Sequence, residues 1–191
     1  MLTAVRLPIR LDADALEAEV AGLDDAAWVP HFNTAYYEGD WSGVALRSVG
    51  GRPAQIYPDP AADEPYADTD LLRRLPALRA ALGRFECELL SARLLRLGPG
   101  ARIREHTDYR LGYEDGELRV HAPITTNPGV EFLLEGRSIE MAPGEAWYLD
   151  LNRKHAVANR GSASRVHLVV DCVVSDWLTA QLQAGDAPGS G

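Results

Sequence analysis

Cysteine is scarce in this sequence, and long apolar runs are absent. Only Cys87 and Cys172 occur, far apart and without a C-x-x-C partner, so neither a disulfide framework nor a thiolate zinc site is indicated. We expect two reduced, buried thiols. No run of about eighteen apolar residues occurs, and the first residues lack the charged lead and apolar segment of a secretion signal. The sequence therefore predicts a cytoplasmic protein.

Positively charged residues are also relatively few. The 19 lysines and arginines are outnumbered by 28 aspartates and glutamates, and the formal net charge is −9 at pH 7. An acidic surface repels nucleic acid and anionic membranes unless a local basic patch overrides the mean, and no dense basic run occurs. Hydrophobic residues make up 46% of the sequence, which is ordinary for a folded domain. We expect a globular protein without a nucleic-acid or membrane partner.

The length of 191 residues favours a single domain with one active site. We expect this domain to span residues 1–183, with a helical and irregular part over 1–84 and a β-rich core over 85–177. The residues from 184 to 191 are mostly small or polar, which predicts a disordered tail.

Two helical stretches are expected in the N-terminal part. Asp12 is a suitable N-cap for a helix over 13–21, whose alanines, glutamates and leucine favour helix. A second stretch is expected over 69–75, and Pro76 ends or kinks it before the helix-forming residues 77–82.

The residue pattern of the sequence changes after residue 84. Short segments with alternating or β-branched residues are separated by turn signals such as Gly98-Pro99-Gly100 and Asp115-Gly116. The predicted strands span 85–97, 102–108, 117–124, 130–134, 138–141, 146–150, 155–159 and 165–174, with earlier ones near 43–48 and 55–57. Eight or more short strands predict a mainly β fold of the double-sheet jelly-roll class, with flanking helices in its N-terminal part.

Three side chains in this β-rich part can bind a metal. His106 and Asp108 stand two residues apart, so in a strand they point to the same face and can chelate. The H-x-D pair alone is weak, because such pairs are usually ordinary surface or core residues. His155 begins another predicted strand and supplies a second imidazole. Two imidazoles and one carboxylate form the facial triad that suits non-haem iron(II).

Arg165 is an unusual residue in an otherwise apolar strand. The turn at Arg160-Gly161-Ser162 predicts that 155–159 and 165–169 form a hairpin. In that register His155 faces His167, and Arg165 lies on the metal face, about 7–8 Å diagonally from the ligand.

A buried arginine needs an anion, because an unpaired buried charge is costly. The far carboxylate of a dicarboxylate, chelated to the metal through its 2-oxo acid end, would meet this need. A structural salt bridge from Arg165 to Asp150 or Asp171 is an equally good explanation at this point.

Arg119 and His121 repeat the pattern on another strand, since both lie on one face of residues 117–124. They can hold a carboxylate of the cosubstrate or the substrate, or they can form a hydrogen-bonded network within the sheet.

Taken together, these segments resemble the aspartyl/asparaginyl β-hydroxylase family, and the pattern is similar to bacterial proline cis-4-hydroxylase-like members. The resemblance spans roughly residues 90–177, and the stretches 31–34 and 41–47 upstream are also similar. It rests on His106-Thr107-Asp108, Leu118-Arg119-Val120-His121-Ala122-Pro123, Gly144-Glu145-Ala146-Trp147-Tyr148, and His155 followed by Arg165-Val166-His167-Leu168.

The resemblance implies a double-stranded β-helix of the jelly-roll, cupin-like class that uses iron(II), O2 and 2-oxoglutarate. It implies hydroxylation of an amino acid or amino-acid-like substrate, whether free, peptidyl or carrier-bound, with release of succinate and CO2. His106, Asp108 and His155 would be the metal ligands. The cofactor-binding candidates are Arg165, which would clamp the distal carboxylate, and Arg119, His121 and His167.

Asp108 is a departure from the animal enzymes of the family, which carry a glycine at this place. The complete triad resembles that of the proline hydroxylases, which weakens the transfer of the animal enzymes' peptide substrate to this chain. Related iron halogenases give up the carboxylate ligand to make room for chloride. Asp108 therefore favours hydroxylation.

The substrate contacts are expected to come from outside the triad. The candidates combine aromatic walls with groups that can recognise an amino-acid carboxylate or amide. They are Trp41, Arg47, Asn33, Tyr36 and Arg93.

Two other functions are compatible with parts of the pattern. A non-oxidative, cupin-like metal protein, either an isomerase or a small-molecule sensor, would use the same three ligands but leaves Arg165 without a role. A structural jelly roll that binds a sugar or a protein leaves the triad itself unexplained.

Overall fold

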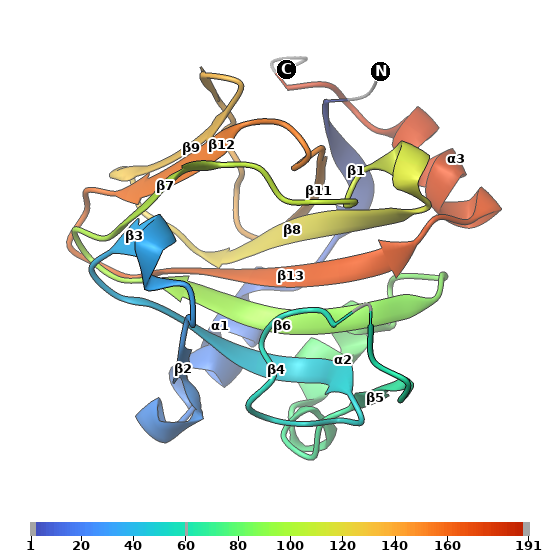
Figure 1. Cartoon of the computed structure of the whole chain (residues 1–191), viewed down its shortest axis with the longest axis horizontal. Helices are drawn as coiled ribbons and strands as arrows, with labels where there is room; N and C mark the ends of the chain where they lie inside the picture. Colours follow the sequence, from blue (N-terminus) through green and yellow to red (C-terminus); the bar gives the residue numbers. More distant parts are fainter. Residues whose placement is uncertain (1–2, 60, 189–191) are drawn as a thin grey trace.

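The larger of two β-sheets runs through the middle of the protein, described here from a computed structural model that covers residues 3–59 and 61–188 (Figure 1). Neighbouring strands in this sheet are antiparallel. Their order is β1 (Ala4–Arg10), β11 (Glu145–Leu149), β8 (Glu117–Thr125), β13 (Arg165–Val173), β6 (Leu89–Leu97), β4 (Trp41–Val49) and β2 (Val29–Pro30), with β5 (Tyr66–Asp68) paired to β4.

A smaller antiparallel sheet lies against one face of the larger one. Its order is β10 (Arg137–Ser138), β9 (Val130–Leu134), β12 (His155–Asn159), β7 (Arg102–His106) and β3 (Tyr37–Glu38). Two packed antiparallel sheets form the jelly roll that the sequence predicts, and the predicted mainly β fold class is confirmed.

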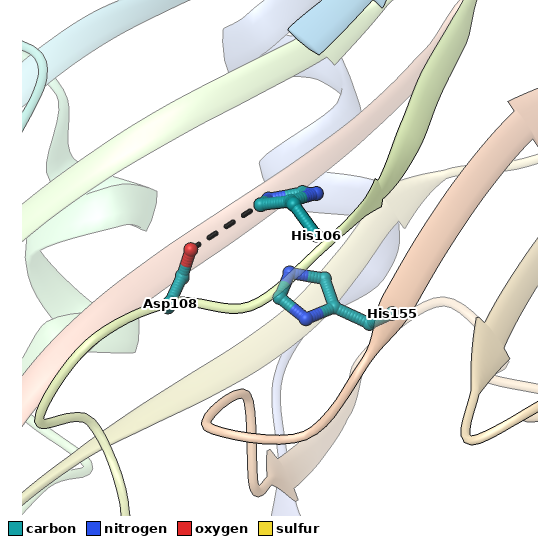
Figure 2. A group of neighbouring side chains, drawn as sticks. All are labelled: His106, Asp108 and His155. Carbon is teal, nitrogen blue, oxygen red and sulfur yellow. Dashed lines mark ion pairs between the residues drawn. The ribbon is translucent and has the colours of Figure 1, made fainter.

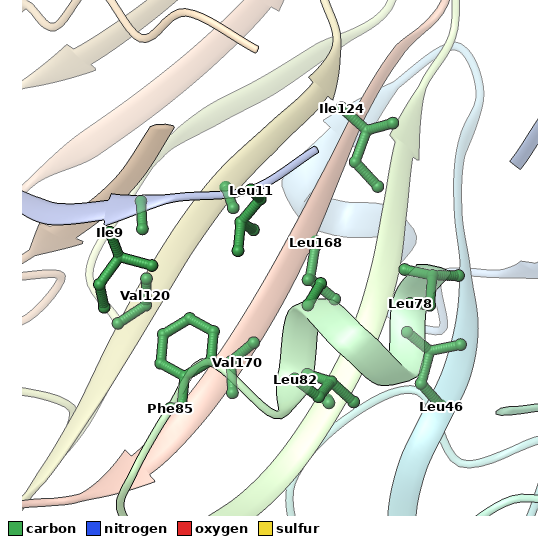
Figure 3. Close-up of a cluster of buried hydrophobic side chains, with 14 of the residues drawn as sticks. Ile9, Leu11, Leu46, Leu78, Leu82, Phe85, Val120, Ile124, Leu168 and Val170 are labelled. Atoms are coloured by element: carbon green, nitrogen blue, oxygen red, sulfur yellow. The ribbon is translucent and has the colours of Figure 1, made fainter. Parts of the chain in front are cut away.

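The central strand β13 explains why the protein has two cores. Side chains alternate along a strand, so Leu168 and Val170 point to one face of the sheet while Arg165 and Asp171 point to the other. The apolar face packs against the helices, and Figure 3 shows Leu168 and Val170 beside Leu82 in this core. The face that carries charge is turned toward the smaller sheet.

Three α-helices contribute buried side chains to the core on the apolar face. They are α1 (Ala13–Ala21), α2 (Pro76–Leu82) and α3 (Asp176–Ala184). None of these described helices is long and apolar enough to cross a membrane.

A second apolar cluster fills part of the space between the two sheets. Leu97 and Leu149 come from the larger sheet, and Phe132 and Val157 come from the smaller one. Apolar contacts of this cluster therefore hold the two sheets together.

Most predicted elements occur at the expected places. The predicted helix over 13–21 matches α1, and the strands over 130–134 and 155–159 match β9 and β12. Asp12 caps α1, since its carboxylate accepts a hydrogen bond from the amide of Ala15 at 3.1 Å. The other strands from β6 to β13 begin or end a few residues from their predicted bounds.

Several predictions of local structure are wrong. No strand forms over 55–57, and the stretch 69–75 contains only the 3₁₀ turn Leu72–Arg74. Strand β1, which contains Pro8, was not predicted; a proline is tolerated there because β1 is an edge strand. Helix α3 and the hydrogen bonds beyond it were not predicted either.

The predicted tail is ordered at its beginning. The amide of Arg6 donates to the carbonyl of Asp186 at 2.8 Å, and the guanidinium of Arg6 donates to the Asp186 carboxylate at 2.6 Å. Residues 189–191 of the predicted tail lie outside the described residues.

The predicted hairpin of 155–159 with 165–169 does not form. β12 pairs with β7 and β9, whereas β13 pairs with β6 and β8 in the other sheet. The turn after β12 therefore crosses between sheets. A strand that is buried on both faces needs a neighbour on each side, which β6 and β8 provide for β13.

Asn159 holds this crossing in place. Its side-chain amide is fully buried and donates to the carbonyls of Leu97 at 3.0 Å, Gly98 at 3.1 Å and Ala163 at 2.8 Å. The side-chain carbonyl accepts from the amide of Gly161 at 3.1 Å.

We expect Asn159→Ala to lower the free energy of unfolding by about 2–3 kcal/mol, because buried carbonyls then lose their donor. Urea denaturation measures this difference. Asn33→Ala is the matched control, because the side chain of Asn33 makes no hydrogen bond to the described residues, and its effect should stay within about 0.5 kcal/mol. Equal effects of the two substitutions would contradict the role of Asn159.

Candidate functional site

The three predicted metal ligands come together at one end of the smaller sheet. His106 ends β7 and His155 begins β12, and the two residues are direct partners across these antiparallel strands. Asp108 lies two residues after His106, in the segment that follows β7. The hydrogen bond from the Asp108 amide to the carbonyl of Leu151, at 2.8 Å, fixes this segment. Ligand atoms of all three lie within 4.8 Å of one another (Figure 2).

Backbone carbonyls orient both imidazoles. Nδ1 of His106 lies 2.8 Å from the carbonyl of Arg104, and Nδ1 of His155 lies 3.0 Å from the carbonyl of Arg153. A carbonyl accepts only, so each Nδ1 carries the proton and each Nε2 has a free lone pair. Burial lowers the pKa of His155 and favours the neutral form that binds metal. Two imidazole nitrogens and one carboxylate fit iron(II).

A buried network on the larger sheet supports the third ligand. Arg119 on β8 donates from Nη1 to the Asp108 carboxylate and from Nε to Asp171 Oδ1 at 2.6 Å. Arg93 on β6 donates to Asp171 Oδ2 at 2.9 Å. Burial alone would raise the pKa of Asp171, but Arg119 and Arg93 outweigh it and hold that pKa below its usual range.

Arg119 therefore belongs to a network within the sheet, one of the two alternatives left open by the sequence. The network reaches the metal site directly through Asp108. Arg119 links the two sheets, because Asp108 extends from the smaller sheet and Asp171 belongs to the larger one.

Arg165 has a different environment at the opposite end of β13. It is 2% exposed, its Nη2 lies 2.7 Å from Nδ1 of His167, and its Nε has no hydrogen-bond partner among residues 3–59 and 61–188. Burial lowers the pKa of Arg165 to about 9. The alternative of a salt bridge to Asp150 or Asp171 is wrong, because these carboxylates pair with Arg153 and with the Arg93 and Arg119 guanidinium groups.

Two neutral histidines lie beside Arg165. Nδ1 of His167 is 3.4 Å from Nδ1 of His121, and Nε2 of His121 has no hydrogen-bond partner in the described part of the chain. Burial, reinforced by the charge of Arg165, holds the pKa of both histidines well below the ordinary value. Both are therefore uncharged near neutral pH and can only donate or accept hydrogen bonds.

One cavity of about 480 Å³ joins these parts. The metal triad lines it together with Arg93, Arg119, His121 and Arg165, and among the predicted substrate residues Asn33, Tyr36 and Trp41 also line it. Its size is in the range of sites for small molecules.

Two predicted residues lie outside this cavity. Arg47 donates to Asp68 at 2.8 Å and to two backbone carbonyls instead. A register shift between Ala45 and Arg47 turns Arg47 to the other face of β4, so Arg47 does not line the cavity as predicted for a substrate contact. His167 lines a separate cavity on the far side of Arg165.

Several cavity residues were not predicted. Five aromatic side chains line the cavity without having been predicted, and they are His31, Phe32, Tyr57, Tyr109 and Phe132. All but Phe132 of β9 lie outside the regular strands, where no periodic pattern marks their direction. The only sequence signal that His31 and Tyr109 line the cavity was their position in the chain, His31 shortly before Trp41 and Tyr109 directly after Asp108.

The comparison with known proteins agrees with this geometry. The family model described as "Aspartyl/Asparaginyl beta-hydroxylase" matches residues 9–174. The chain belongs to the aspartyl/asparaginyl β-hydroxylase family. The match includes the triad, Arg119, His121 and Arg165, and the resemblance seen in the sequence is confirmed.

A curated relative and two solved structures show how far the similarity extends. The "L-proline cis-4-hydroxylase" of Rhizobium meliloti (strain 1021) is 27% identical over 168 residues, which cover 85% of this β-hydroxylase family member but 58% of the relative. The chain therefore matches less than two thirds of that relative's length.

The solved structures confirm the fold. A Pseudomonas putida prolyl-4-hydroxylase superposes with a TM-score of 0.55 at 15% identity, covering 92% of this chain and 94% of the other. A non-heme alpha-ketoglutarate-dependent epimerase from nogalamycin biosynthesis gives a TM-score of 0.53 at 14% identity, with coverages of 100% and 86%.

The unpaired charge of Arg165 has a measurable consequence for stability. We expect Arg165→Met to raise the free energy of unfolding of the protein without metal or small molecules by about 1–4 kcal/mol, because a buried charge is replaced by an apolar side chain. Urea denaturation of the purified apoprotein measures this.

Arg119→Met is the matched comparison. It removes a guanidinium that is paired with Asp171, so it should lower stability by about 3–5 kcal/mol. If both substitutions destabilise the apoprotein equally, Arg165 does not carry an uncompensated charge.

Proposed function

We propose that the protein is an iron(II)- and 2-oxoglutarate-dependent dioxygenase that hydroxylates a C–H bond of an amino acid or an amino-acid derivative. The reaction uses O2 and releases succinate and CO2. The observation that carries the proposal is the buried Arg165, which lines the same cavity as the metal triad and has no carboxylate partner among the described residues.

The proposed roles follow from the contacts. His106, Asp108 and His155 hold the metal from one side, and this ligand set leaves coordination positions open. Iron(II), when bound, supplies the oxidation of an unactivated C–H bond by O2 with 2-oxoglutarate as the electron source. Arg165 binds the distal carboxylate of 2-oxoglutarate with two parallel N–H donors, as guanidinium groups do with carboxylates.

Two further residues assist. Arg119 holds the Asp108 carboxylate in the direction of the metal, so it positions a ligand. His121 is neutral, its Nε2 has no partner among the described residues, and it lines the same cavity as Arg165 and His155, so it would form a hydrogen bond to the bound dicarboxylate. The apolar walls formed by Phe132, Leu151 and Val157 exclude water from this space.

An amino-acid substrate is supported by the similarity to the L-proline cis-4-hydroxylase. Hydroxylation is favoured over halogenation because Asp108 completes the triad and points toward the two histidines. A non-oxidative metal protein with the same triad would leave Arg165 as a buried charge without an anion, which is costly.

The decisive experiment is an anaerobic titration of the iron(II) protein with 2-oxoglutarate. We expect a visible metal-to-ligand charge-transfer band on binding, followed in air by succinate release that depends on 2-oxoglutarate. Arg165→Met should weaken the affinity for 2-oxoglutarate at least about thirtyfold, since one partner of a buried charge pair is lost.

Two controls make the result interpretable. Arg47→Met removes an arginine outside the cavity and should leave the band unchanged. His155→Ala removes a ligand and should abolish the band at every concentration of 2-oxoglutarate. If the wild-type protein binds iron(II) but develops no band, the cosubstrate assignment is wrong.

A further inference from the structure

The cavity has a second cationic end, remote from Arg165. Arg165, His167, Val169 and Asp171 share the inner face of β13, and Arg93 is the direct partner of Val169 on β6. Four residues of strand separate Arg165 from this position, which corresponds to about 13 Å. An anion on Arg93 is therefore distinct from one on Arg165.

Half of the Arg93 guanidinium is free to bind a ligand. The residue is 4% exposed, and its Nη1 donates to Ser91 Oγ at 2.6 Å and Asp171 Oδ2 at 2.9 Å. Its Nε and Nη2 have no hydrogen bond to the described residues, and Arg93 lines the cavity. A buried donor that faces a cavity marks a place for an acceptor.

The charges around Arg93 favour an anion. Arg93 and Arg119 share Asp171, and Arg119 also pairs with Asp108. Asp108 is a candidate metal ligand, so its charge is engaged by iron(II) in the proposed complex and one positive charge of the two guanidinium groups remains. A carboxylate on the substrate would complete the balance, with two hydrogen bonds from Nε and Nη2.

The cavity offers no matching partner for an ammonium group. Among the described residues that line it, the only carboxylate is Asp108, which already binds Arg119 and belongs to the metal triad. Burying an ammonium without a partner is costly. A free zwitterionic amino acid would thus have a partner for its carboxylate, which is Arg93, but none for its ammonium group.

Exposed aromatic side chains surround the cavity opening. Phe32 is 64% exposed and Tyr109 is 86% exposed, and both line the cavity, as do the half-exposed Tyr36 and Tyr57. We call these four residues the aromatic rim. Phe32 stacks on His31 with ring centroids 4.9 Å apart and contacts Tyr57 at 4.8 Å. Clustered exposed aromatic surface at a cavity is suited to an apolar group that extends outward.

We propose that the substrate is an N-acylated amino acid, whose carboxylate binds Arg93 and whose acyl group lies on the aromatic rim. Acylation makes the nitrogen an uncharged amide, which removes the need for an acidic partner. This proposal rests on the proposed function and specifies its substrate class; an N-acyl amino acid and the C-terminal residue of a peptide share the same chemistry.

The test compares ligands by the rise in melting temperature of the iron(II) and 2-oxoglutarate complex under anaerobic conditions. The panel contains the free L-amino acids, their N-acetyl derivatives and the N-acetyl amides, which lack the carboxylate. We expect the best N-acetyl amino acid to bind at least tenfold more tightly than its free form and at least thirtyfold more tightly than its amide. Dipeptides with the same C-terminal residue distinguish peptides from small acyl compounds.

Arg93→Gln should abolish the preference for acid over amide while the 2-oxoglutarate band persists, which shows that the site is still folded. Arg93→Lys keeps the positive charge and is the substitute test variant if Arg93→Gln does not fold. Phe32→Ala should weaken the binding of N-benzoyl amino acids at least threefold more than the binding of N-acetyl amino acids. Tyr113→Ala, which removes an exposed aromatic residue outside the cavity, is the control.

Three outcomes would overturn the proposal. They are a free amino acid that binds as tightly as its N-acetyl form, an amide that binds as tightly as the acid, and a lack of binding by every N-acetyl amino acid. In each case a persisting 2-oxoglutarate band would leave the oxygenase assignment intact, whereas loss of the band in the wild-type protein would refute that assignment instead.

Discussion

The structure depends on how charge is compensated on the inner face of the larger sheet. Asp171 is 1% exposed and forms ion pairs with the guanidinium groups of Arg93 and Arg119. Arg119 in turn reaches Asp108, so one buried carboxylate determines where a candidate metal ligand of the other sheet lies. The same strand places Arg165 beyond the reach of this carboxylate, and the shortage of negative charge at that end creates a site for an anion.

The local parts of the site could be predicted from the sequence. His106 and Asp108 share a face because they are two residues apart, and Arg165 is recognisable as a charge in an apolar strand. The sheet partners could not be predicted in this way. The turn after His155–Asn159 has the same local pattern whether it closes a hairpin or crosses to the other sheet, and the choice depends on burial of β13 by distant strands.

Other errors have equally specific causes. Arg47 has the correct alternation for the inner face, but a one-residue register shift in β4 reverses its direction. The aromatic rim comes from irregular segments without period, so no alternation pattern in the sequence indicates where Phe32 and Tyr109 point. The fold class was predictable because strand alternation and turn residues recur along the chain, and the packing of two sheets does not require knowledge of their exact order.

The two sheets contribute different parts of the candidate site. The candidate metal ligands belong to β7, β12 and the segment after β7, whereas Arg93, Arg119 and Arg165 stand on β6, β8 and β13 of the larger sheet. Under the proposed function, substitutions on β4 and β6 would alter which molecule fits without changing the strands that hold the iron. Such a separation would let the substrate preference change while the iron site stays constant, with Arg119 as the one guanidinium among the described residues that contacts both Asp108 and Asp171.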